Sequence, residues 1–87
     1  MTTHRKYTTT EARLLGDRLR IDWTAIDLEQ FRLGLEVEME HGLHDPQTNV
    51  TGDDPILTGK IALAHLKELP DYYTRLRAME QEAEATH

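Results

Sequence analysis

The chain has 87 residues, a formal net charge of -6 and no cysteine, so it suits one small domain and excludes disulfides and thiolate metal sites. Residues 1–20 carry a formal charge of +3 and the remaining 67 residues carry -9, which argues against nucleic acid as the main partner. No apolar run has the length of a membrane span, and no signal-peptide pattern opens the chain. We therefore expect one cytoplasmic domain over residues 1–87.

The first predicted helix begins at a capping box. Thr8 and Glu11 have the spacing in which a hydroxyl accepts a hydrogen bond from the backbone and the Glu returns one. The helix should run to about Leu19, with Ala12 and Leu15 on its apolar stripe. The arm before it, residues 1–7, is expected to be frayed.

The second predicted helix follows another capping-box spacing, Asp27 and Gln30. It should run to about His41, because Gly42 stands where a left-handed residue often ends a helix. Gly34 lies inside this helix, and a helical glycine costs about 1 kcal/mol relative to alanine. A close approach of another helix is the expected reason.

The third predicted helix starts at Pro55, since Asp54 is a favoured N-cap and proline is favoured at the first helical position. Pro70 should stop it near Leu69. Gly59 inside it predicts a second close helix approach. A fourth helix follows Pro70, and the polar residues 81–87 after it are expected to fray. The apolar set of that helix is Tyr72, Tyr73, Leu76 and Met79.

These elements predict an all-α fold, a small compact four-helix domain with a long structured loop between helices two and three. Turn-forming residues such as Asp-Pro, Thr-Asn and Thr-Gly fill that loop. Polar loops on rigid scaffolds commonly carry function. The loop is therefore the first place to look for a site.

The segment from residue 33 to residue 59 holds six carboxylates and two histidines but no Lys or Arg. Its most specific spacing is Glu38-x-x-His41, which places two metal-ligand types on one helix face. The sequence thus offers a site for a divalent metal ion, with the candidate ligands Glu38, His41, His44, Asp45 and Asp53. The alternative is an ordinary solvated acidic face whose carboxylates serve in capping and turns.

Two related metal patterns fit less well. An EF-hand loop starting at Asp45 would need Gly and Glu where Val50 and Ile56 stand, so only a looser calcium site stays open. His65 should lie too far along its helix from His41 to share a metal. We expect His65 to be half-buried and bonded to a carboxylate or a carbonyl, with Asp22 or Asp27 as a plausible partner.

Apolar residues beyond those needed for one core face suggest an interaction surface. Helix two carries Leu33 and Val37 in this way, and helix three carries Ile56 and Leu63. The pair Tyr72-Tyr73 offers an aromatic platform or, as the alternative, closes the core. The candidate interaction residues are Val37, Leu63, Tyr72 and Tyr73.

Several segments together make the chain resemble a known family. They are the run from Glu36 to Gly42, the run from Asp45 to Thr51, the pair Asp53-Asp54, the run from Thr58 to Glu68 and the run from Pro70 to Tyr73. The chain resembles a family of small bacterial, archaeal and phage proteins classified as a domain of unknown function. The resemblance spans residues 8–80 and implies a single-domain member, but it brings no activity.

Three hypotheses follow from these residues. The first is a small acidic non-enzymatic protein-interaction module that binds a protein partner or forms a homodimer. The second is a divalent-cation-binding protein using the Glu/His/Asp cluster. The third is an enzyme with Glu40 or His41 as general base, which no paired nucleophile supports.

Overall fold

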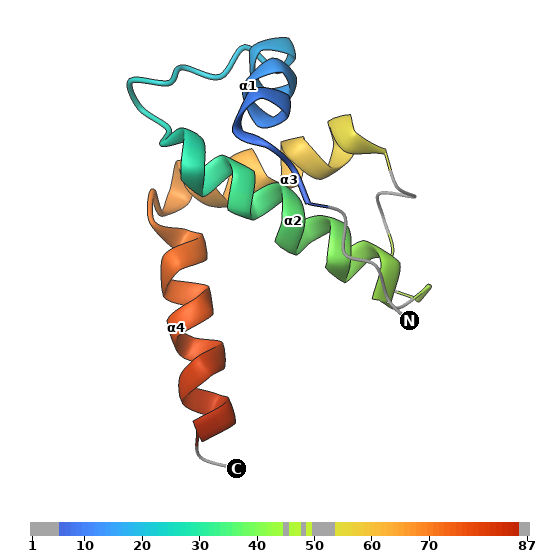
Figure 1. Ribbon diagram of the computed structural model, residues 1–87, viewed down its shortest axis with the longest axis vertical. Helices are drawn as coiled ribbons and strands as arrows, with labels where there is room; N and C mark the ends of the chain where they lie inside the picture. Colours follow the sequence, from blue (N-terminus) through green and yellow to red (C-terminus); the bar gives the residue numbers. More distant parts are fainter. Residues whose placement is uncertain (1–5, 45, 48, 50–53, 86–87) are drawn as a thin grey trace.

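The computed structural model describes residues 6–44, 46–47, 49 and 54–85, and the side chains of all of these except residues 41–44. The described chain forms four helices: α1 (Thr9–Arg18), α2 (Leu28–His44), α3 (Pro55–Glu68) and α4 (Tyr72–Ala85). Helix α2 is central and packs against the other three (Figure 1). The all-α prediction is confirmed. None of the helices in this part of the chain combines the length and apolar character that crossing a membrane requires.

Helix α1 begins and ends with well-formed caps. The Thr8 hydroxyl accepts from the backbone N–H of Glu11 at 3.1 Å, and the Glu11 carboxylate accepts from the backbone N–H of Thr8 at 3.0 Å, as predicted. At the other end Arg20 has a φ of 59°. Its N–H donates to the carbonyl of Asp17 at 3.0 Å, and that of Ile21 donates to the carbonyl of Gly16 at 2.9 Å. This is a Schellman ending with arginine in the position that favours glycine.

The start of α2 is as predicted, but its end is not. The Asp27 carboxylate accepts from the backbone N–H of Gln30 at 3.0 Å, but the Gln30 side chain donates to the Thr74 hydroxyl and makes no return bond, so only half of the predicted capping box forms. The helix passes through Gly42 and continues to His44, so the predicted end at Gly42 is wrong. One glycine inside a helix costs only about 1 kcal/mol, whereas proline disfavours helical geometry in the residue before it. Pro46, two positions after His44, is the more effective stop.

Helix α3 has the predicted bounds, while α4 is longer than predicted. The Asp54 carboxylate caps α3 by accepting from the backbone N–H of Ile56 at 2.8 Å, and Leu69 is the C-cap just before Pro70. Helix α4 runs to Ala85, although fraying was expected from residue 81. Glu, Gln and Ala dominate residues 80–85, and all three are good helix formers.

The core lies where α1, α3 and the first turn of α4 meet α2. Its largest fully buried side chains are Phe31, Leu35, Leu66 and Thr58. A Cβ on Gly34 would lie 2.5 Å from Cε2 of Tyr73 and 2.9 Å from Cβ of Ala62. A Cβ on Gly59 would lie 2.8 Å from Cδ1 of Leu19. Both glycines therefore mark close helix contacts, which confirms the prediction for them.

The chain before α1 is anchored at Tyr7, which the sequence placed in a frayed arm. Tyr7 is only 5% exposed. Its backbone N–H donates to Oε2 of Glu36 at 3.1 Å, and its carbonyl accepts from Nη1 of Arg32 at 3.3 Å. Arg32 and Glu36 also bind each other at 2.8 Å, so α2 presents both a donor and an acceptor to the incoming backbone.

Candidate functional site

The junction of α2, α3 and α4 is built around the carboxylate of Glu38. The Glu38 side chain is 11% exposed, and its Oε2 accepts a hydrogen bond from the Tyr73 hydroxyl at 2.8 Å. Nε2 of His65 lies 3.5 Å from the same oxygen. One residue from each of the three helices thus meets at a single carboxylate oxygen.

Aromatic contacts continue this junction on the side of α4. The rings of His65 and Tyr72 stack, with centroids 4.4 Å apart and planes 4° apart. Tyr72 and Tyr73 meet edge to face at a centroid distance of 4.9 Å. Aromatic pairs of these geometries add to the stabilisation from burial alone. The His65–Tyr72 stack holds the first turn of α4 against α3, and the contact between the two tyrosines lies within that turn.

The Tyr73 hydroxyl acts in this junction as a hydrogen-bond donor. Burial raises the pKa of Tyr73 far above its usual range, and the negative charge of Glu38 raises this pKa further. The hydroxyl therefore keeps its proton at all physiological pH values. A protonated phenol held by a carboxylate stabilises the packing and does not serve as a nucleophile or base.

His65 is half-buried beside a carboxylate, as predicted, but the carboxylate is not Asp22 or Asp27. The structure places His65 beside Glu38, whereas the Asp22 carboxylate accepts from the backbone N–H and the hydroxyl of Thr24. Helices α2 and α3 touch at Gly34 and Ala62. Glu38 and His65 each lie about one turn from this contact, and the distance between them depends on the angle at which α3 crosses α2, which an estimate from helix rise alone leaves out.

The predicted metal ligands are only partly within the described structure. Glu38 is described, and its Oε2 lies against Tyr73 and His65. His41 and His44 lie in the last turn of α2, but their side chains are not among those that the structure describes. Asp45 and Asp53 lie outside the described residues. Among the described side chains, no group of three or more His, Cys, Asp or Glu is arranged to hold a metal ion. The metal hypothesis therefore rests on sequence alone.

The four predicted interaction residues lie in different environments. Val37, Leu63 and Tyr72 are half-buried against the core, and Tyr73 is 2% exposed. For Tyr73 the structure shows the core-closing alternative. Val37 also lines a groove of about 180 Å³ between α2 and α4. Its other apolar lining comes from Leu33 and Leu76, and charged side chains stand beside them, namely Glu40, Arg77 and Glu80.

Helix α4 carries an apolar stripe that the domain covers only in part. The stripe has the spacing of a heptad repeat, with Tyr72, Leu76, Met79 and Ala83 at intervals of four, three and four. Tyr72 and Leu76 pack against the core, but Met79 is 60% exposed and Ala83 is exposed. Helix α4 projects away from the other helices, so its C-terminal part meets none of them (Figure 1). The sequence placed Met79 in the apolar set of this helix, but it did not predict that Met79 is exposed.

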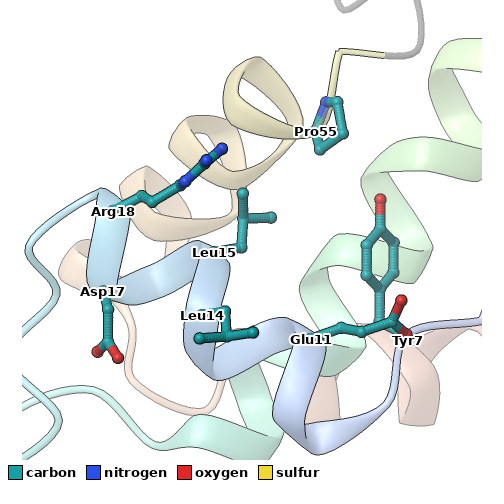
Figure 2. Close-up of a pocket in the computed structure, with 7 residues that line it drawn as sticks. All are labelled: Tyr7, Glu11, Leu14, Leu15, Asp17, Arg18 and Pro55. Atoms are coloured by element: carbon teal, nitrogen blue, oxygen red, sulfur yellow. The ribbon is translucent and has the colours of Figure 1, made fainter.

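A second, wider groove lies on the other side of the domain. It has a volume of about 620 Å³ and lies between α1 and Pro55 at the start of α3, with Tyr7 at one end (Figure 2). Leu14 and Leu15 supply its apolar lining. Of its charged members, Glu11 belongs to the α1 capping box and Asp17 accepts from the Trp23 indole at 2.8 Å. Those two carboxylates therefore serve the fold.

Comparison with known proteins gives a family and no activity. The family model described as "Protein of unknown function (DUF5661)" matches residues 12–82. No curated protein and no solved structure matches the chain. The match covers most of the sequence and agrees with the resemblance seen in its motifs. The chain belongs to the DUF5661 family.

Proposed function

We propose that this protein is a small acidic, non-enzymatic interaction module of the cytoplasm, and that α4 together with the α2–α4 groove is its binding surface. The observation that carries the proposal is the stripe on α4. The stripe begins at Tyr72, which packs against the core, and leads out of the domain to Met79, which is 60% exposed. The partner that fits such a stripe is an amphipathic helix laid along it.

The energetics of α4 support a partner. All side chains of residues 77–85 are exposed, so this part of the helix gains little from packing within the domain. Helices of this length are marginal on their own because most helical stability comes from a buried face. Full burial of a methionine side chain stabilises by about 1.5–3 kcal/mol. A partner helix over Met79 would supply what the domain itself does not.

The junction at Glu38 supports the proposal from the inside. Its Tyr73 bond and the stack of His65 on Tyr72 fix the direction in which α4 leaves the domain. A surface held in its bound conformation loses less entropy on binding. The groove lined by Leu33, Val37 and Leu76 lies at the base of the projecting helix and extends the apolar surface onto α2.

Photo-crosslinking tests this function directly. A photoreactive amino acid replaces Met79, with the same replacement at exposed Ala64 on α3 as the matched control. The proposal predicts a discrete crosslinked species from position 79 in cells and none from position 64. Absence of any species specific to position 79 would refute it.

A further inference from the structure

We propose that the helix that covers α4 belongs to a second copy of this chain, paired antiparallel with the first. This inference rests on the proposed function and names the partner of that surface. It follows from the register of the stripe and from the charges beside it. The pairing is isologous, so each copy gives the other the same contacts.

The register of the stripe is self-complementary when the helices run in opposite directions. In an antiparallel pair of helices with heptad repeats, each a position of one helix faces a d position of the other. Leu76 then lies against Met79 of the second copy, and Tyr72 lies against Ala83 of the second copy. The exposed part of one stripe thereby covers the half-buried part of the other.

The charges beside the stripe match in the same register. Arg75 and Glu82 are seven residues apart and flank one side of it. Antiparallel pairing at the register above places Arg75 against Glu82 of the second copy, twice by symmetry. Arg75 also binds Asp71 in its own helix, with 2.8 Å between Nε and Oδ1, but this pair is exposed and the guanidinium has further N–H donors.

The helix dipole supports an antiparallel neighbour as well. Acidic residues favour the first turn of a helix and basic ones the last, but α4 has neither arrangement. Its arginines, Arg75 and Arg77, precede its glutamates, Glu80, Glu82 and Glu84. An antiparallel copy brings glutamates to the arginine end and arginines to the glutamate end. The net charge of -6 opposes association, but salt screens it beyond about 8 Å.

A charge-swap cycle followed by sedimentation equilibrium tests the pairing with the full chain. Arg75→Glu places a glutamate against Glu82 of the other copy at both symmetric contacts. The dimer dissociation constant should therefore rise about ten-fold. Adding Glu82→Arg restores opposite charges and should recover most of the loss. Lys60→Glu on an exposed site of α3 is the matched control for net charge and should change the constant little.

The outcomes separate this inference from the function on which it rests. A wild-type chain that stays monomeric up to about 1 mM overturns the self-pairing, as does a swapped variant that fails to recover. A crosslinked species from position 79 that contains a different protein, found with a monomeric chain, overturns the self-pairing but leaves the proposed function standing. No species from position 79 removes both.

Discussion

Replacing Gly34 with alanine tests the tight junction of α2, α3 and α4. The new Cβ would lie 2.5 Å from Cε2 of Tyr73 and 2.9 Å from Cβ of Ala62, well inside the ordinary contact distance of about 3.5–4.0 Å. The Tyr73 ring is buried and its hydroxyl is held by Glu38 at 2.8 Å, so the ring has little freedom to retreat.

The magnitude follows from two opposing effects. Alanine gains about 1 kcal/mol over glycine as a helix former. Overpacking typically costs about 1–3 kcal/mol, and losing a hydrogen bond to a charged acceptor costs about 1.5–3 kcal/mol. The two costs together exceed the gain, so we expect Gly34→Ala to lower the free energy of unfolding by about 1.5–5 kcal/mol. The melting temperature should fall by about 4–8 °C per kcal/mol.

Thermal unfolding followed by far-UV circular dichroism provides the assay. Ala64→Gly, at an exposed position inside α3, measures the propensity difference in this protein without a packing change. Its expected cost is about 1 kcal/mol. If Gly34→Ala instead raises the melting temperature by as much as Ala64→Gly lowers it, α4 does not pack against α2 as described.

Three further predictions concern pH, backbone strain and metal. Because the folded state raises the pKa of Tyr73, the unfolded chain loses this proton first. The contribution of Tyr73 to stability should therefore be constant below a pH of about 10 and should fall above it by up to about 1.4 kcal/mol per pH unit, a slope that Tyr73→Phe reduces in urea titrations. Arg20→Gly should stabilise the protein by about 1 kcal/mol, because glycine removes the strain of a positive φ. Arg18→Gly, in the last turn of α1, is the control and should not stabilise it. Equal melting temperatures for the two variants would be inconsistent with the Schellman ending. Because the Glu38 carboxylate already binds the Tyr73 hydroxyl, added zinc, calcium, manganese or iron should leave the melting temperature unchanged. A metal-dependent rise in the melting temperature that the double variant Glu38→Gln, His41→Ala abolishes would favour the metal hypothesis instead.

Local chemistry made most of the fold predictable. Thr8, Asp27 and Asp54 cap the helices as expected, and Pro70 follows the end of α3. Gly34 and Gly59 were recognised as contact points because only packing offsets their cost in a helix. Where two local signals competed, the prediction was less secure. Gly42 was taken as a stop, but α2 continued through it toward Pro46.

The candidate site was less predictable because it depends on contacts far apart in sequence. Glu38 and Tyr73 are 35 positions apart, and their bond depends on how α4 crosses α2. The sequence grouped Glu38 with His41 by helical spacing, a local criterion that carries no information about α4. Exposure of Met79 has the same origin. Its apolar character predicts burial, but only the direction of α4 decides that the domain leaves it uncovered.

Distances between spin labels on α4 test the central claim most directly. The chain has no cysteine, so Ala78→Cys and Ala85→Cys each give one label per copy at an exposed position. In the antiparallel pair the two labels at position 78 lie almost opposite each other, while those at position 85 are separated by about 20 Å more along the helix axis. The account predicts this difference in the electron–electron dipolar distances. Equal distances at the two positions, or no dipolar coupling at concentrations well above the dissociation constant, would contradict it.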